Sequence, residues 1–347
     1  MGVITTLVLG ACSLAQAADA SAEVPADRVI YVPSTVLEPA RQLLRLAQKA
    51  QLWKLQVPAP GDLEGWKKLR AALEAAAEPG VLKAIERNEV TVSSIKLGGV
   101  PVLDVKPKGW RDNGKVIVFT HGGAYTMNTA RSGLPHAAPV AHASGMRVVS
   151  VDYTKAPDVS WKEMQEEVVD VFKALLAQGY RMKDIAIFGA SAGGGLATST
   201  VLNLRDRGMG MPAAVVLWSP WVDLTEVGDT MHTLRDAEPA LDYERMLRPS
   251  ALAYAAGLPL DDPHVSPLYA NFTKGFPPTL VQEGTKTIFL SGSARLYQKI
   301  VEAGQPAYFD IYEGMIHVFQ QFPMPESDVA IRRSVEFMQM RLAGQDK

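Results

Sequence analysis

Cysteine is nearly absent from this chain: its 347 residues include only Cys12, so no disulfide can form within it. The chain also has no large excess of charge of either sign: 35 Lys and Arg residues nearly balance 37 Asp and Glu residues, and the net charge is −2. That balance argues against partners such as nucleic acids and other polyanions. The six histidines show no H-E-x-x-H or clustered spacing, and the glycine-rich stretch 189–195 lacks the G-x-G-x-x-G order. We therefore expect neither a metal nor a nicotinamide cofactor.

A long apolar run is also missing, since the mostly apolar residues 3–14 are too few to span a membrane. They end in the small-x-small sequence Ala15-Gln16-Ala17, which is typical of a signal peptide, although no Lys or Arg precedes them. We predict a signal peptide over residues 1–17 and an exported protein, periplasmic or secreted. Alternatively, residues 9–12 (L-G-A-C) resemble a lipobox, and Cys12 would then carry a lipid anchor.

Residues 18–88 show no strand pattern, and we predict a leader followed by a helical cap. Apolar residues recur at helical spacing after Ser34 until a P-A-P-G stop at 58–61, and further helices are predicted over 63–77 and 81–87. These helices either pack simply on the main domain or form a lid over its functional site.

Residues 89–347 alternate strand and helix patterns and form the predicted main domain. An antiparallel hairpin is expected over 89–97 and 100–105, joined by two glycines. Buried strands are predicted over 115–120, 146–152, 184–188, 213–218, 279–283 and 307–312, and helices over 131–143, 160–177, 194–205, 292–303 and 327–342. This order indicates an α/β fold with a mostly parallel sheet flanked by helices. Residues 221–275 interrupt the alternation, and we expect an insertion there that contributes to the cap.

The most informative stretch is Gly189-Ala190-Ser191-Ala192-Gly193, between the strand 184–188 and the following helix. A G-x-S-x-G motif at such a junction places the serine on a sharp turn, with its hydroxyl exposed above the sheet. We interpret Ser191 as a nucleophile; the alternative is a purely structural turn.

Two further motifs follow strands. His121-Gly122-Gly123 comes directly after the strand 115–120, and glycines there allow backbone N–H groups to face a negative charge developing on oxygen. We expect Gly122, Gly123 and the residue after the serine, Ala192, to form an oxyanion hole, against a simple glycine turn. His317 follows the last strand and is the candidate general base.

The ordered series HGGAY, GASAG, DPHVSPLY and GMIHVF, within residues 115–322, resembles the bacterial hormone-sensitive lipase family of α/β-hydrolases. The resemblance implies the α/β-hydrolase fold with a helical N-terminal cap, a catalytic domain over 89–347, no metal, and a carboxylesterase that hydrolyses short- to medium-chain acyl esters. It also implies the nucleophile Ser191, the base His317, the oxyanion donors Gly122, Gly123 and Ala192, and a role for His121 in orienting the glycine loop.

The third member of the triad departs from the family. Where the resemblance places the acid, the chain has Lys286 and Thr287, and the further acid near position 292 is replaced by glycine. The acid normally holds the histidine tautomer and stabilises the imidazolium, and its loss in a serine protease costs about 10⁴ in rate.

Three explanations stay open. Glu283, at the end of a strand, could serve as the acid, unless it merely pairs with a cation such as Lys286. Ser191 and His317 could work as a dyad, with Thr287 or water orienting the histidine. The site could also be inactive and bind a small molecule. The other acids within the motifs are interpreted as caps and turn formers: Asp152, Asp223 and Asp262.

Substrate choice depends on the pocket beside the predicted nucleophile. Large side chains that could line an apolar cavity, but that are more often ordinary core, are Trp53, Trp66, Tyr125, Met127, Met231 and Met246. Amides, lactones and soluble polyester oligomers remain alternatives to short esters.

Overall fold

The computed structural model describes residues 28–345. The predicted signal peptide over residues 1–17 and Cys12 lie outside the described residues. In the part of the chain that the structure describes, no helix has both the length and the apolar character needed to cross a membrane.

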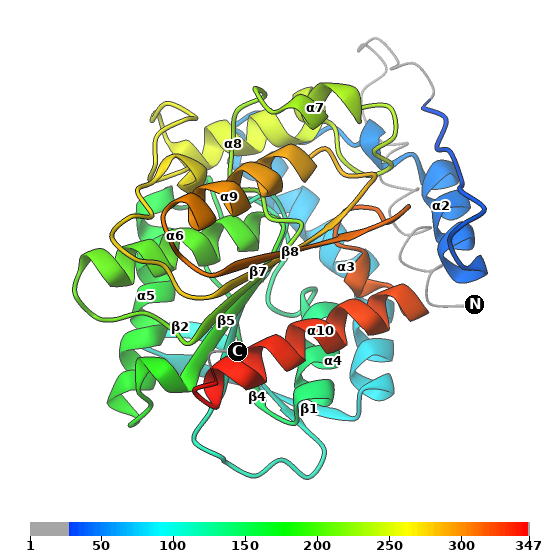
Figure 1. Cartoon of the computed structure of the whole chain (residues 1–347). Helices are drawn as coiled ribbons and strands as arrows, with labels where there is room; N and C mark the ends of the chain where they lie inside the picture. The colour runs from blue at the N-terminus through cyan, green and yellow to red at the C-terminus, as the bar shows by residue number, and fades with distance from the viewer. Residues whose placement is uncertain (1–27, 346–347) are drawn as a thin grey trace.

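Among these residues, an eight-stranded sheet runs through the middle of the molecule in the order β1-β2-β4-β3-β5-β6-β7-β8 (Figure 1). The strands are β1 Val90–Leu97, β2 Val100–Pro107, β3 Val116–Thr120, β4 Arg147–Val151, β5 Ile185–Ala190, β6 Ala214–Trp218, β7 Thr279–Gly284 and β8 Ala307–Tyr312. β1 and β2 are antiparallel to each other, β2 is antiparallel to β4, and all other neighbours are parallel. The predicted mostly parallel sheet is therefore confirmed.

Helices cover both faces of the sheet, which is why β3, β4, β5 and β6 are buried along their whole length. The α-helices of the described residues are α2 Glu38–Ala50, α3 Leu63–Arg87, α4 Leu134–Ser144, α5 Trp161–Ala177, α6 Ala192–Asp206, α7 Asp229–Thr233, α8 Arg248–Ala255, α9 Leu290–Glu302 and α10 Pro325–Leu342. The apolar residues of α4 and α10 pack in one core cluster, and those of α5, α6 and α9 pack in another.

The predicted hairpin is present, with Leu97 paired to Val100 across Gly98 and Gly99. Both glycines have positive φ, 58° and 85°, as a two-residue turn between antiparallel strands requires.

The N-terminal helices differ from the prediction in two respects. α2 begins at Glu38 after Leu37, and not at a Ser34 cap, because Pro39 is favourable in its first turn. The helices predicted over 63–77 and 81–87 are one helix, α3, which continues through Pro79. Tertiary contacts offset the hydrogen bond that proline removes, since Gly80 and Val81 are buried and Glu78 pairs with Arg131.

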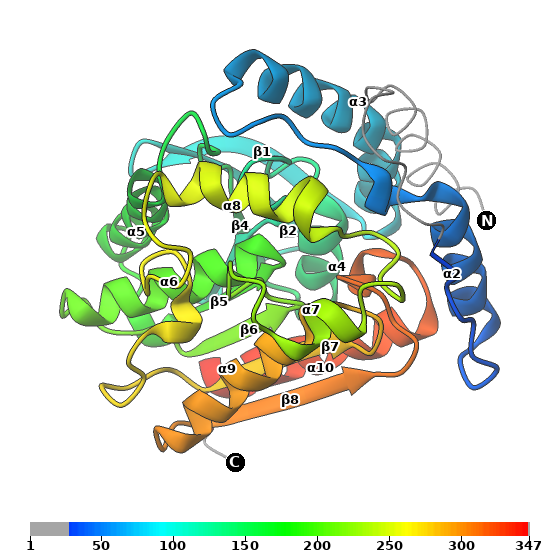
Figure 2. The ribbon, with the colours of Figure 1, turned by 90° about the horizontal axis from the view of Figure 1, so that it is seen from above.

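The segment 221–275 contains α7, α8 and short helical turns at 243–247 and 267–269. α7 and α8 lie above the sheet in Figure 1 and nearest the viewer in the view from above, with α3 along one side (Figure 2). The segment thus lies above the sheet; its predicted contribution to a cap stays a prediction.

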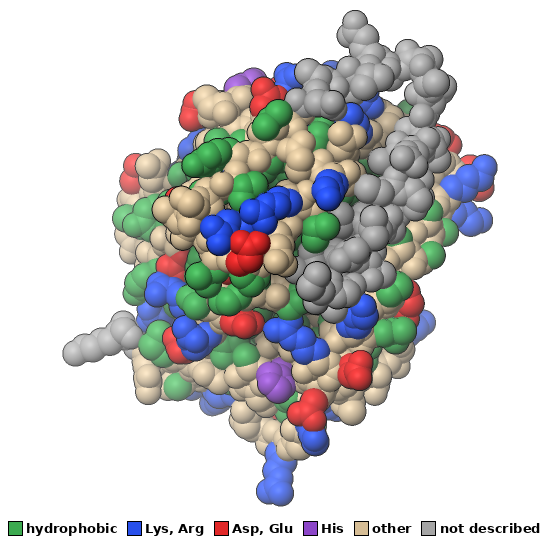
Figure 3. Space-filling view, turned by 90° about the vertical axis from the view of Figure 1, so that its right-hand side faces the viewer, with side chains coloured by type: hydrophobic (Ala, Val, Ile, Leu, Met, Phe, Trp, Pro, Cys, Tyr) green, Lys and Arg blue, Asp and Glu red, His purple; other side chains and the backbone are tan. Residues whose placement is uncertain are grey.

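Charged side chains of both signs are interspersed on the face shown in Figure 3, where described residues form the surface. This distribution agrees with the near-zero net charge of the sequence.

Candidate active site

The predicted site residues gather where the parallel strands end at their carboxyl termini, the usual ligand edge of an α/β sheet. The glycine loop follows β3, Ser191 follows β5, Glu283 lies at the end of β7, and His317 lies in the loop after β8; Ser219, which was not predicted, follows β6 at the same edge.

Ser191 occupies the turn between β5 and α6 with φ 56° and ψ −125°, a backbone conformation that costs a non-glycine residue energy. Its amide donates to the Trp218 carbonyl at 2.9 Å, and its carbonyl accepts from the Trp221 amide at 2.9 Å. Side chains at Gly189 and Gly193 would collide with backbone atoms. The motif glycines are therefore required by the close approach of β5, α6 and β3, and the strained turn is the one expected for a nucleophile.

The glycine loop lies directly against the serine. A Cβ on Gly122 would lie 3.0 Å from the Ser191 Cβ, and Gly123 has φ 115°, where a side chain would collide with the Met127 carbonyl. Within residues 28–345, the amides of Gly122, Gly123 and Ala192 have no hydrogen-bond acceptor. Free amides beside a nucleophile are what an oxyanion hole needs.

His121 supports this loop from within the core. Its Nδ1 lies 2.7 Å from the Gly122 carbonyl, its ring stacks on Tyr153 at 4.1 Å, and the Tyr153 hydroxyl donates to its carbonyl at 2.6 Å. Burial lowers the pKa of His121 to about 3, so the ring is neutral at physiological pH. These contacts agree with the orienting role implied for His121.

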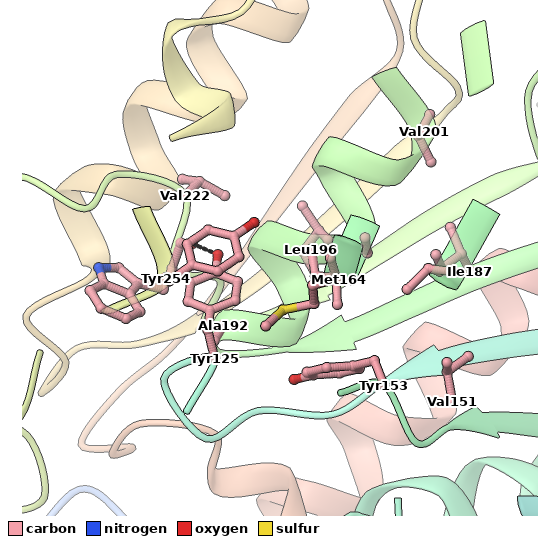
Figure 4. Close-up of a cluster of buried hydrophobic side chains, with 14 of the residues drawn as sticks. Tyr125, Val151, Tyr153, Met164, Ile187, Ala192, Leu196, Val201, Val222 and Tyr254 are labelled. Atoms are coloured by element: carbon pink, nitrogen blue, oxygen red, sulfur yellow. Dashed lines mark hydrogen bonds between the residues drawn. The ribbon is translucent and has the colours of Figure 1, made fainter. Parts of the chain in front are cut away.

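Tyr125 closes the loop. Its ring stacks on Tyr254 at 3.9 Å (Figure 4), and its hydroxyl donates to the Trp221 carbonyl at 3.1 Å. A side chain at Gly195 would collide with this hydroxyl, so α6 and the loop can approach closely only with glycine there. Tyr125 and the other large residues considered as cavity lining are buried core residues: Trp53, Trp66, Met127, Met231 and Met246.

His317 is held by its loop and by an aromatic ring. The Val318 amide donates to Ser219 Oγ at 3.1 Å, Lys286 N donates to the Met315 carbonyl at 3.1 Å, and the Phe289 ring meets the imidazole edge-on at 5.1 Å. Burial, with a smaller contribution from His136, lowers the pKa of His317 to about 3. Ser191 and His317 share this edge of the sheet, but no hydrogen bond joins them among the described residues; in structures without substrate such contacts are often long.

The predicted contact between Glu283 and His317 is not present. The buried Nδ1 of His317 has no hydrogen-bond partner among residues 28–345. The Glu283 carboxyl group is engaged elsewhere: it accepts from the Gly284 amide at 3.1 Å and from Ser293 Oγ at 3.0 Å, and the Ser219 hydroxyl partly offsets the rise that burial causes in its pKa. As a direct acid partner of the histidine, Glu283 is therefore not supported by the geometry.

The residues at the family's acid position do not take its place. Thr287 Oγ1 accepts from the Phe289 amide at 3.3 Å, and Lys286 Nζ lies over the Tyr31 ring, 5.7 Å from its centroid. Lys286 makes no ion pair with Glu283 among the described residues. Neither side chain orients His317.

Glu238, which the sequence analysis missed, is a second fully buried carboxyl group beside this loop. It accepts from the Ala240 amide at 2.9 Å and from the Ile288 amide at 3.4 Å. Burial raises the pKa of Glu238 to about 7 and that of Glu283 to about 8, and the charge of Glu238 adds to the rise at Glu283. No local pattern distinguishes Glu238 from the exposed acids around it.

The remaining motif acids have structural contacts, as expected. Asp152 accepts from the Ala130 amide at 3.0 Å, Asp223 pairs with Arg295 at 2.7 Å, and Asp262 accepts from the His264 amide at 2.9 Å. Within the described residues, no three His, Cys, Asp or Glu side chains come together in a way that could hold a metal ion.

Known proteins are similar to this chain both in sequence and in structure. The model of a family described as having the α/β-hydrolase fold matches residues 117–321. An esterase of Acinetobacter venetianus is 32% identical over 250 residues, which are 72% of this chain and 82% of the esterase. A crystal structure of an esterase from the bacterial hormone-sensitive lipase family has a TM-score of 0.74 and 31% identity, and covers 80% of this chain and 96% of its own. The chain belongs to the hormone-sensitive-lipase-like α/β-hydrolases.

Other relatives of this hormone-sensitive-lipase-like hydrolase agree. An acetyl-hydrolase of Streptomyces hygroscopicus is 32% identical over 251 residues, which are 69% of this chain and 83% of that enzyme. The esterase E25 has a TM-score of 0.80 at 26% identity, covering 92% of this chain and 98% of its own. The resemblance carried by the four motifs is confirmed, and the protein is an esterase-type α/β-hydrolase.

Proposed function

We propose that this hydrolase is a serine carboxylesterase that cleaves short- to medium-chain acyl esters through an acyl-enzyme on Ser191. The observation that supports this most is the close approach of Gly122 to the strained Ser191 turn, together with the amides of Gly122, Gly123 and Ala192, which have no acceptor within residues 28–345. The arrangement serves acyl transfer, since donors stand where negative charge would develop.

The reaction would proceed in two acyl-transfer steps. The Ser191 Oγ–H proton passes to Nε2 of His317 while Oγ bonds the ester carbonyl carbon, and the carbonyl π electrons move to an oxygen held by the three amides. The C–O bond to the alcohol then breaks, and the alcohol leaves with the proton from Nε2. Water, deprotonated in turn by His317, attacks the acyl-enzyme, releases the carboxylic acid and restores Ser191.

The expected acyl group is small. Large aromatic side chains crowd the surroundings of His317: Trp221 stacks on Phe289 with the rings 5.8 Å apart, and Phe289 meets the His317 imidazole edge-on. These large side chains leave little depth for a long chain. The similarity to an acetyl-hydrolase supports the same choice.

The test combines labelling with turnover. A fluorophosphonate should label wild-type protein and not Ser191→Ala, and p-nitrophenyl acetate and butyrate should be hydrolysed faster than the octanoate and palmitate. Absence of both labelling and turnover in folded wild-type protein would refute the esterase function. A preference for palmitate would refute only the acyl length.

A second candidate function is small-molecule binding without catalysis. It is favoured by one observation, the His317 Nδ1 that has no acceptor among the described residues. This function predicts that short esters raise the melting temperature of the wild type without being hydrolysed.

We further propose that the protein is exported, by cleavage near Ala17 or as a lipoprotein anchored at Cys12. The sequence pattern at residues 3–17 is the only support. Mass spectrometry of the mature protein separates the two forms, and retention of residues 1–17 would contradict both.

A further inference from the structure

A buried chain of polar contacts links Glu283 to the loop that carries the proposed base. Against the rise that burial causes, the Ser219 hydroxyl lowers the pKa of Glu283 as a side-chain partner, and Ser219 Oγ accepts a hydrogen bond from the amide of Val318, the residue after His317, at 3.1 Å. Glu283 and Ser219 are fully buried, and Val318 nearly so. The chain therefore lies in the core, where water does not compete for its hydrogen bonds.

The donors and acceptors of this chain match. Ser219 Oγ uses a lone pair for the Val318 amide, so the single hydroxyl hydrogen remains for Glu283. The Ser219 amide donates to the Gln282 carbonyl at 2.9 Å, which fixes the end of β6 to β7. Ser219 and Val318 both have positive φ, 44° and 47°. Two strained residues that meet through one hydrogen bond indicate a contact that the fold maintains at a cost.

Glu283 is itself fixed on its other sides. Gly284 N and Ser293 Oγ bind its two carboxyl oxygens, and Glu238 holds the Ile288 amide of the adjoining loop. Phe289, in the same loop, meets the His317 ring edge-on. The Phe289 ring thus contacts the imidazole directly, and the Glu283–Ser219–Val318 chain holds the backbone next to His317.

We propose that Glu283 is a positioning residue that holds His317 through Ser219 and the Val318 amide, and that His317 acts with Ser191 as a dyad without a carboxylate on Nδ1. This inference rests on the proposed esterase function and assigns Glu283 a role different from that of a triad acid. The two roles differ in what they require: a triad acid must be a carboxylate, whereas a positioning residue needs only matching donors and acceptors.

The experiment compares kcat and KM for p-nitrophenyl acetate in wild type, Glu283→Gln, Glu283→Ala and Ser219→Ala. Glutamine can keep the contacts to Gly284, Ser293 and Ser219, so Glu283→Gln should retain kcat within about fivefold. Glu283→Ala and Ser219→Ala should lower kcat by about 10²-fold with little change in KM, because the base is displaced while substrate contacts remain. Glu302→Ala, at the exposed end of α9, is the matched control and should equal wild type.

Each outcome separates the hypotheses. A loss of about 10⁴ in kcat for folded Glu283→Gln would overturn the positioning role and restore Glu283 as the triad acid. Wild-type kcat in both alanine variants would show that the chain does not position His317. Should Glu283→Ala not fold, Ser219→Ala decides alone. Lack of turnover in folded wild-type protein would refute the esterase function itself. The outcomes above, in contrast, concern variants of an active enzyme and test only the positioning role.

Discussion

Replacing Glu283 with glutamine should flatten the decline in the protein's stability between pH 5 and pH 8. Burial raises the pKa of Glu283 from 4.5 to about 8, so the folded protein keeps a proton that the unfolded chain has released. Stability then falls as pH rises through this window, because the folded state binds more protons than the unfolded state. At about 1.4 kcal/mol per pH unit, Glu283 alone accounts for a decline on the order of 5 kcal/mol.

The assay is chemical denaturation of wild type and Glu283→Gln at pH 5, 6.5 and 8. Glutamine cannot titrate, so the stability of the variant relative to wild type should rise by about 1.4 kcal/mol for each pH unit above 4.5. Subtracting one free energy of unfolding from the other cancels the contributions of titratable groups that both proteins share. These include His121 and His317, whose lowered pKa values act in the opposite direction, with stability lost as pH falls below 6.5.

Glu238 provides an internal comparison, since burial raises its pKa from 4.5 to about 7 and it remains in both proteins. In Glu283→Gln, the free energy of unfolding should therefore still decline with rising pH, less steeply than in wild type, until about pH 7. Parallel stability profiles for the two proteins would refute the reasoning, because Glu283 would then titrate in the folded protein as it does in the unfolded chain.

Three further outcomes follow from the contacts. Thr287→Glu restores a carboxyl group at the family's acid position, and kcat should rise at least about tenfold as the pKa of His317 rises; unchanged kinetics would show that position 287 does not reach the ring. Gly122→Ala places a Cβ 3.0 Å from the Ser191 Cβ and should lower kcat by about 10²-fold with a near-native melting temperature, whereas normal turnover would exclude Gly122 from the oxyanion hole. Arg70→Ala removes hydrogen bonds from α3 to the Thr126 and Ala156 carbonyls, at 2.7 and 2.6 Å, and should destabilise the protein by about 2 kcal/mol; unchanged thermal unfolding would show that α3 does not depend on them.

The parts of the fold that sequence predicts best are those in which one local pattern decides the structure. The short apolar run from Val116 to Thr120, rich in β-branched residues, favours an interior strand, and Gly98-Gly99 between two alternating segments favours a tight turn; the structure has both. Ser191 was predictable for the same reason, since the two motif glycines report directly how closely β5 and α6 approach.

Long-range contacts explain what the sequence did not reveal. The break predicted before Val81 fails because Pro79 is tolerated where α3 packs on the rest of the molecule. Glu283 is a strand-end acid in sequence, but whether it meets His317 or Ser219 depends on the path of a loop more than thirty residues later along the chain. Glu238 reaches the same region from the 221–275 segment, and no sequence spacing connects it to Ile288.

The missing acid has a definite energetic consequence for His317. Burial without a carboxylate keeps the imidazole neutral, and hence able to accept a proton, at every physiological pH. The same burial opposes the imidazolium that the proposed mechanism requires, since no carboxylate of the described residues hydrogen-bonds Nδ1 to offset its desolvation. His317 is therefore neutral and able to accept a proton at physiological pH, but it is a weak base. The proposed oxyanion hole does not depend on the acid, because Gly122 and Gly123 follow β3, Ala192 follows β5, and His121 and Tyr125 hold the glycine loop. In a serine protease, rate enhancement of about 10³–10⁴ survives the loss of a triad member through the oxyanion hole and substrate binding. Under the proposed mechanism, an intact elbow and glycine loop, with no carboxylate hydrogen-bonded to His317 among residues 28–345, would give a slow esterase, in which keeping the His317 ring in place matters more than tuning its basicity.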